Sequence, residues 1–247
     1  PSTVTGIYNE AFAGCENLVK ITVAEGNAIY HSSGNCLIKT ADKKVVLGCK
    51  TRVIPNDGSV TIIGEYAFYS CDIVSIVIPE SVTIIEDAAF EFCEKLETVY
   101  IPDTIEYVGN MAFYSYYKSF VYNEKDGLLY FGNENNPYLV LVEIVEEYDD
   151  DLISVSIAEG CKIITGQPFS SCWNLSNVVI PEGVTFIGTY TFNYCSSLTT
   201  LTLPNSIECL ESYAFAGCNN LKSISYNGTV EEWNDVVKES GWNNNIT

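Results

Sequence analysis

Apolar residues recur along the chain at fixed offsets from a phenylalanine, with a period of about 23 residues. An aliphatic residue or a cysteine stands eight positions before each of these phenylalanines, and an aliphatic residue stands five positions before it. A cysteine follows three positions later in six of the seven units, and Tyr116 replaces it in the other. The phenylalanine column is Phe12, Phe68, Phe90, Phe113, Phe169, Phe192 and Phe215. Because one such unit cannot bury its apolar side alone, the period predicts coils that stack on one another.

Each coil also contains a segment that is typical of a half-buried strand. Residues 96–101 (LETVYI) and 198–203 (LTTLTL) alternate polar and apolar positions in their second halves. Prolines end these segments, since proline cannot donate to a strand ladder, and they are Pro79, Pro102, Pro181 and Pro204. We expect these strands to pair from coil to coil in a parallel sheet on one side of a solenoid. The Ala-Phe-x-x-Cys segments should form short helical turns on the other side.

Two longer spacings of 56 residues interrupt the period. Residues 36–49 (CLIKTADKKVVLGC) and 128–144 (LLYFGNENNPYLVLVEI) each contain an apolar run, a polar turn and a second apolar run, which predicts two β-hairpin insertions. Phe12, Phe113 and Phe215 are separated by 101 and 102 residues. We therefore predict one solenoid over residues 1–247, built from two super-repeats at residues 1–113 and 114–226.

Residues 227–247 are predicted to cover the last coil, whose apolar edge is otherwise exposed. Thr229 and Glu232 have the spacing of a helix capping box. A helix starting there would place Val230, Trp233, Val236 and Val237 on one face and end at Gly241. The alternative interpretation is a ligand site built on the tryptophan.

These columns resemble the BspA-type leucine-rich repeat family, whose units read L-x-x-I-x-I-P-x-x-V-x-x-I-G-x-x-A-F-x-x-C. Residues 175–198 match nearly column for column, and the resemblance covers almost the whole chain. It implies a leucine-rich repeat solenoid, a β-rich right-handed coil. The family glycine is replaced in four units, by Tyr8, Glu86, Thr165 and Glu211. Gln167-Pro168 replaces the residue pair before one phenylalanine, so a distorted turn is expected there.

The resemblance also implies a cellular location. BspA-type proteins resemble bacterial surface or secreted adhesins, some of them binding host matrix proteins, so an extracellular or cell-surface location is expected. The N-terminus lacks the charged and apolar regions of a signal peptide, and the chain begins inside a repeating unit. We interpret this start as that of a fragment from which upstream residues have been removed.

The net charge of the chain limits the classes of partner that it is expected to bind. Lysine and arginine number 12 against 32 aspartates and glutamates, for a net charge of −20. Such a surface repels nucleic acid. It favours solubility, with attraction to basic partners or cations as the alternative. No apolar run of eighteen residues is present, so no membrane insertion is expected.

The cysteines predict structural thiols rather than a metal site. Six of the ten occupy one column of the repeat, where a small apolar side chain is needed, and no C-x-x-C pair occurs. Cys36 and Cys49 are equidistant from the turn at Asp42-Lys43, which leaves a disulfide across the hairpin open. Cys161 falls in an aliphatic column and Cys209 has no evident role.

Residues suited to catalysis are scarce. His31 is the only histidine, and it is expected in a surface loop. No nucleotide-binding, zinc-protease or nucleophile-elbow motif occurs. The acidic run from Glu143 to Asp151 lacks the spacing of a calcium loop, so it predicts a solvated loop, with a weak cation site as the alternative. We therefore expect no enzyme activity, no cofactor and no metal.

The open face of the predicted sheet is the candidate binding surface. Strand alternation points a row of mostly small, uncharged side chains outward, with Ser223 and Ser225 at its end. The candidate binding residues are Lys20, Thr22, Ser75, Val77, Thr98, Tyr100, Asn177, Val179, Thr200 and Thr202. Tyr100 is the residue most suited to anchor a partner. This pattern predicts a protein-binding adhesion module. The alternatives are a structural spacer and a glycan-binding module, which would need an exposed aromatic platform.

Overall fold

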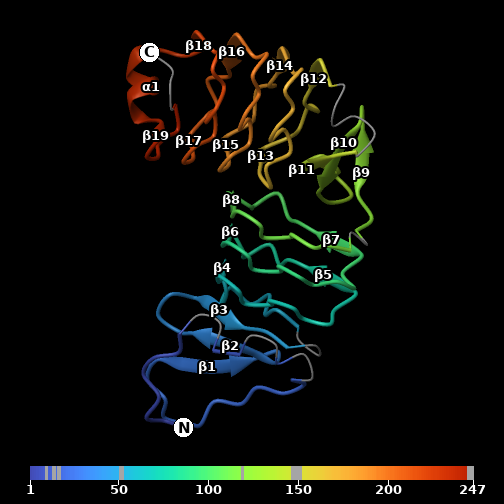
Figure 1. Cartoon of the computed structure of the whole chain (residues 1–247). Helices are drawn as coiled ribbons and strands as arrows, with labels where there is room; N and C mark the ends of the chain where they lie inside the picture. Colours follow the sequence, from blue (N-terminus) through green and yellow to red (C-terminus); the bar gives the residue numbers. More distant parts are fainter. Residues whose placement is uncertain are drawn as a thin grey trace. The chain divides into compact units, whose positions relative to one another are not determined.

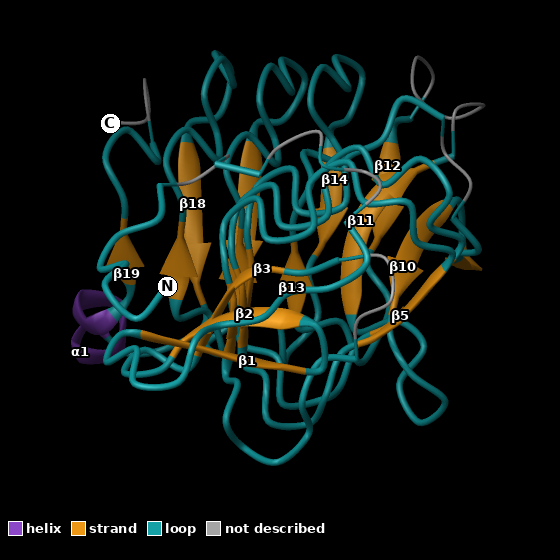
Figure 2. Cartoon of the chain, turned by 90° about the horizontal axis from the view of Figure 1, so that it is seen from below, coloured by secondary structure: helices purple, strands orange, loops and turns teal. Residues whose placement is uncertain are grey.

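The computed structural model describes residues 1–8, 11–12, 15, 18–49, 53–117, 120–145 and 152–243. The chain forms two compact units, Pro1–Val121 and Tyr122–Thr247 (Figure 1). Each unit contains a three-stranded antiparallel meander followed by stacked coils. Strands and turns make up these coils, and among the described residues helix is confined to α1 (Figure 2). The predicted solenoid architecture is therefore confirmed within each unit.

The strands of unit 1 begin with the meander, which follows residues 1–29, and the last strand of the meander leads into a parallel ladder of two-residue strands. The ladder runs in the order β1-β2-β3-β4-β6-β8, while β5 and β7 form a separate parallel pair. The strands are β1 (Tyr30–Ser33), β2 (Cys36–Lys39), β3 (Lys44–Leu47), β4 (Ile62–Ile63), β5 (Ser75–Val77), β6 (Ile84–Ile85), β7 (Thr98–Tyr100) and β8 (Tyr107–Val108).

Unit 2 repeats this plan. One sheet runs in the order β19-β17-β15-β13-β11-β10-β9, and two parallel pairs, β12-β14 and β16-β18, lie apart from it in the hydrogen-bonding pattern. The elements are β9 (Asn123–Lys125), β10 (Leu128–Phe131), β11 (Val140–Ile144), β12 (Ser154–Ser156), β13 (Ile163–Ile164), β14 (Asn177–Val179), β15 (Phe186–Ile187), β16 (Thr200–Leu203), β17 (Cys209–Leu210), β18 (Ser223–Tyr226), α1 (Val230–Asp235) and β19 (Val237–Lys238).

Each regular coil thus contributes two strands, where the sequence pattern predicted one. The additional strand contains the aliphatic residue that stands five positions before phenylalanine. Its register pairs equivalent positions of successive coils, such as Ile63 with Ile85. Both predicted hairpins are present, at β2–β3 and β10–β11, and each gains a third strand, β1 or β9. The last strand of each meander pairs in parallel with the first coil, so the insertion extends the ladder.

The Ala-Phe-x-x-Cys segments turn the chain through successive β-turns, which take the place of the expected helical turns. In the second of these segments, Ala67 N–H donates to Gly64 O and Cys71 N–H donates to Phe68 O. The third residue of each turn, Tyr66 or Ser70, has a φ of 56° or 50°. Non-glycine residues rarely adopt this left-handed conformation. Hydrogen bonds to the next coil, such as Phe68 N–H to Ala89 O at 2.8 Å, hold it in place.

The turn at Gln167-Pro168 keeps this geometry, contrary to the expected distortion. Gln167 has a φ of 65°, like Tyr190 at 58° in the next coil. In that next coil Thr191 N–H closes the turn onto Gly188 O, and proline at the equivalent position has no N–H to do so. The substitution therefore removes one hydrogen bond without changing the course of the chain.

The phenylalanine column forms a file of stacked rings inside each unit. Phe68, Phe90 and Phe113 stack with centroid distances of 4.9 and 5.1 Å in unit 1. Three more, Phe169, Phe192 and Phe215, stack at 5.2 and 5.5 Å in unit 2. The first member, Phe12, is different, because it is 39% exposed. The stacking that the period predicts is therefore confirmed for these six phenylalanines.

The C-terminal cap contains the predicted capping box. Glu232 N–H donates to Thr229 Oγ1, and Thr229 N–H donates to a carboxylate oxygen of Glu232. The predicted single apolar helix face is wrong, because α1 ends at Asp235 and Val237 begins β19, which pairs with β17. Val230 and Val237 are accordingly exposed.

Gly241 follows β19 in a left-handed turn instead of ending the helix. That turn delivers Trp242 onto Phe215, with ring centroids 6.3 Å apart. Trp233 of α1 packs against Trp242 in turn, at 5.8 Å. The two tryptophans therefore cover the end of the phenylalanine file, as the cap interpretation requires.

Candidate functional site

The candidate surface of unit 1 lies on the paired strands β5 and β7. Parallel register places Ser75 beside Thr98 and Val77 beside Tyr100. Ser75, Val77 and Thr98 are exposed, and Tyr100 is half-buried. The intervening Ile76 is buried, so the strand alternation is as predicted. Among these residues Tyr100 offers the largest side chain, but part of it is already packed.

In unit 2 the outward row is longer than predicted. Asn177 and Val179 of β14 lie beside Ser154 and Ser156 of β12, and all four are exposed. On the other pair, Thr200 and Thr202 of β16 lie beside Ser223 and Ser225 of β18. The sequence signal for β12 was Leu152-x-x-Val155-x-Ile157, which follows the family strand pattern but comes directly after the acidic run. The sequence interpretation therefore left Ser154 and Ser156 out of the candidate surface.

Lys20 and Thr22 are exposed but do not join this row. Residues 18–24 form no strand, so no ladder carries them to β5. Both residues line a hollow of about 290 Å³ in unit 1, together with Val4, Phe12 and Tyr30. The structure thus brings eight of the ten candidate residues onto paired strands and leaves these two apart.

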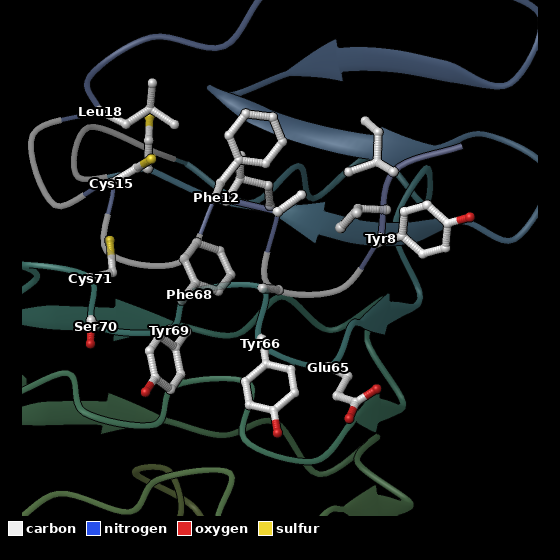
Figure 3. Close-up of a pocket in the computed structure, with 17 residues that line it drawn as sticks. Tyr8, Phe12, Cys15, Leu18, Glu65, Tyr66, Phe68, Tyr69, Ser70 and Cys71 are labelled. Carbon is white, nitrogen blue, oxygen red and sulfur yellow. The ribbon is translucent and has the colours of Figure 1, made fainter. Parts of the chain in front are cut away.

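A second hollow in unit 1 lies on the turn side, where the first coil meets residues 64–71 (Figure 3). Its interior volume is about 30 Å³. Figure 3 shows Phe12 and Phe68 close together within it, whereas Tyr66, Tyr69 and Glu65 point away. Because a cavity needs about 10–15 Å³ of such interior volume to hold one water molecule, this crevice has room for a few waters and not for an organic substrate.

Apart from exposed Cys15, the cysteine column lies in the core, and several of its thiols act as hydrogen-bond donors. Cys93 Sγ donates to Phe68 O at 3.0 Å, and Cys218 Sγ donates to Phe192 O at 2.9 Å. Each acceptor is the carbonyl of the phenylalanine in the preceding coil. The column therefore selects a small apolar side chain that also satisfies a buried carbonyl. Cys36 and Cys49 are both buried and are not joined to each other, so the disulfide left open by their spacing is not formed, and their thiols lie against the carbonyls of Gly34 and Asn35.

Thiol reactivity should separate Cys15 from the other nine cysteines. Cys15 is exposed, and burial raises the pKa of Cys161 to about 12 and that of half-buried Cys209 to about 11. Thiolate is the nucleophile, so a raised pKa slows reaction at pH 8. We expect Ellman's reagent to label one thiol rapidly in the native protein and ten after unfolding. Cys15→Ser should abolish the rapid phase, and a rapid phase of several thiols would contradict the buried column.

The other candidate chemistry is sparse in the described part of the chain. His31 lies on strand β1 rather than in a loop, and its Nδ1 is 2.8 Å from Thr40 Oγ1. Across the described ranges, no group of three or more histidine, cysteine, aspartate or glutamate side chains is placed to hold a metal ion. The acidic residues 146–151 lie outside the described residues, so the predicted solvated loop there stays a prediction.

Comparisons with known proteins find several leucine-rich repeat structures. No curated protein matches the chain. A leucine-rich repeat protein from Eubacterium ventriosum is 21% identical over 100% of this chain and 57% of its own, with a TM-score of 0.43. One from T. pallidum is 23% identical over 88% of this chain and 87% of its own, with a TM-score of 0.37. One from Bacteroides ovatus is 25% identical over 97% and 73%, with a TM-score of 0.35.

None of the helices in the described part of the chain has the length and apolar character needed to span a membrane.

The comparison with family models covers most of the sequence. The model of the BspA-type leucine-rich repeat region matches in six copies, over residues 1–47, 43–134 and 147–239. Those matches contain the stacked phenylalanine files, the thiol column and both sets of outward strands described above. The chain therefore belongs to the BspA-type leucine-rich repeat family.

Proposed function

We propose that this chain is an extracellular adhesion module, without enzymatic activity, that binds a protein partner through the exposed sheet faces of its units. The partner is a basic protein, such as a host matrix protein. The observation that carries the proposal is the row of exposed, mostly uncharged side chains on paired strands, repeated in both units. Leucine-rich repeats are typical of protein-interaction modules, which use extended sheet surfaces for recognition.

The composition of these rows suits a protein better than a small molecule. Ser75 and Thr98 in unit 1, and Thr200 and Thr202 in unit 2, are exposed and offer hydroxyl groups along the strands. Flat surfaces of this kind gain affinity from area and from a few anchors, of which Tyr100 is one. The net charge of −20 adds a long-range attraction for a cationic partner.

The proposal predicts binding that weakens with salt and is lost when charge is placed on the sheet face. Ser75→Arg and Thr200→Arg should each reduce affinity by at least about tenfold, because a cation then faces a basic partner. Thermal stability should not change, since both side chains are exposed. The measurement is binding of the immobilised protein to a panel of matrix proteins across a salt titration.

Asn219→Arg provides the control, because it adds the same charge at an exposed position outside the strands. It should leave binding within the error of the wild type. If no member of the panel binds saturably, the chain is a spacer that presents other domains. A loss of thermal stability in Ser75→Arg would mean that the strand faces are reversed.

A further inference from the structure

Aromatic side chains form a continuous surface row across three successive turns of unit 1. Tyr69 contacts Phe92 edge-on with ring centroids 5.4 Å apart, and Phe92 contacts Tyr114 at 5.8 Å. Tyr116 stacks on Phe92 at 5.1 Å and contacts Tyr114 at 5.5 Å. Tyr66 extends the row through Tyr69, at 5.5 Å. These five residues, which we call the aromatic row, lie on the turns and not on strands β5 and β7.

The backbone fixes this row. Phe92 has a φ of 57°, and its N–H donates to Tyr114 O at 2.8 Å. One turn further on, a carboxylate oxygen of Glu94 accepts from Ser115 Oγ at 2.7 Å and from Tyr117 N–H at 3.1 Å. These bonds clamp the chain on both sides of Tyr116. The rings are therefore held together before any partner binds, which lowers the entropy cost of binding.

Two adjacent rings of the row, Tyr114 and Tyr116, are exposed to solvent, and the other three rings are half-buried. Tyr114 is 40% exposed and Tyr116 is 70% exposed. One face of Tyr116 lies on Phe92, so that exposure belongs mainly to its opposite face and edges. Figure 3 shows the start of the row, with Tyr66 and Tyr69 pointing away from the crevice beside Glu65. Contiguous exposed aromatic surface of this kind marks interaction sites.

The charge around the row selects the partner. The three turns, residues 64–72, 86–95 and 109–117, contain six carboxylates and one lysine. That lysine, Lys95, pairs with Asp72 at 2.7 Å, and Lys44 from outside these turns pairs with Glu86, so the six carboxylates exceed these two lysines by four. Carboxylates therefore outnumber lysines in these turns, and the bonds from Ser115 and Tyr117 place the Glu94 carboxylate next to Tyr116. Aromatic faces flanked by carboxylates match a guanidinium group, which stacks on rings and pairs with carboxylates through its planar fork.

We propose that the aromatic row of unit 1 binds an arginine-rich segment of a partner protein. Guanidinium groups stack on Tyr116 and the neighbouring rings while the surrounding carboxylates neutralise their charge. A sugar is less well matched, because Tyr69 and Tyr114 meet Phe92 at 78° and 69° and so form no flat platform. This surface is distinct from the sheet face and would add a second contact to the same class of basic partner.

A synthetic arginine–glycine repeat peptide tests the proposal, with the matched lysine–glycine peptide as comparison. Calorimetry at physiological salt should show binding to the arginine peptide that is stronger than to the lysine peptide. The double variant Tyr114→Ser with Tyr116→Ser should weaken arginine-peptide binding by about tenfold. Tyr194→Ser, which removes an exposed tyrosine of unit 2, is the control and should not weaken it.

The outcomes are separable from those of the sheet-face proposal. Thr200→Arg, which blocks the sheet face, should leave arginine-peptide binding unchanged. Equal binding of the two peptides, or no effect of the double variant while its unfolding midpoint matches the wild type, would overturn the proposal in favour of general electrostatic attraction. Absence of any binding to the arginine peptide would overturn it as well.

Discussion

Phe192→Ala should lower the free energy of unfolding by about 3–5 kcal/mol. The Phe192 ring is fully buried, and it stacks between Phe169 at 5.2 Å and Phe215 at 5.5 Å. Truncation leaves a cavity that is closed by a ring on either side. Those rings cannot collapse into it without breaking the backbone bonds between coils, such as Phe192 N–H to Ala214 O at 2.8 Å. Urea unfolding followed by circular dichroism measures the change.

Phe12→Ala is the matched control, because it makes the same change in the same sequence column. Phe12 is 39% exposed, so less apolar surface returns to water and no enclosed cavity forms. Its cost should be about 1–2 kcal/mol, well below that of Phe192→Ala. If the two substitutions cost the same, the stability would come from the repeat motif itself and not from the ring file.

The period of the sequence was sufficient to predict which residues stack. A ring that recurs every coil must lie over its predecessor if successive coils have equal length, and Phe68 and Phe90 differ by only 2° in ring plane. The period does not predict which coils have a packed neighbour on both sides, and so which phenylalanines are fully buried. That depends on how residues 1–24 pack, and there the pattern is present while strands are absent from the described residues. The exposure of Phe12 and the displacement of Lys20 and Thr22 both follow from this.

Backbone conformation was beyond the reach of the pattern. Tyr66, Phe92 and Tyr190 adopt left-handed φ values that their side chains do not favour. Hydrogen bonds to the next coil supply the compensation, and these exist only once the coils have stacked. The same holds for the cap, where pairing with β17 turns Val237 from helix to strand. The start of α1 could be predicted because the capping box involves only neighbouring residues. The end of α1 could not, because it depends on pairing with β17.

The candidate sheet face was predictable from strand alternation, but the aromatic row was not. Its members come from different columns, and Tyr116 occupies the position of a buried cysteine. Cys93, which holds this column position one coil earlier, is buried. Ser115 is buried in its place, at 5% exposure, and donates to Glu94, while Tyr116 turns outward onto Phe92. The break in the cysteine column was visible in the sequence, but its consequence required the packing.

Gly48→Ala should destabilise the protein by about 2–3 kcal/mol through overpacking. A Cβ atom on residue 48 would lie 1.7 Å from a ring carbon of Phe68. That ring cannot move aside, because Phe90 stacks on it at 4.9 Å. Gly48 cannot retreat either, since its N–H donates to Ala67 O at 2.7 Å. The meander therefore joins the coils through a position where only glycine fits, although nothing in the repeat pattern marks it.

A double-mutant cycle with Phe68→Leu identifies the contact responsible. A smaller side chain at Phe68 relieves the clash, so the double variant should be more stable than the sum of the two single changes predicts, by about 1 kcal/mol or more. Gly6→Ala is the control for the intrinsic effect of alanine, because a Cβ atom there would have no neighbour within 4 Å. That control should shift stability by less than about 0.5 kcal/mol. Strict additivity in the cycle would show that Gly48 is required for its backbone and not for the approach of the Phe68 ring.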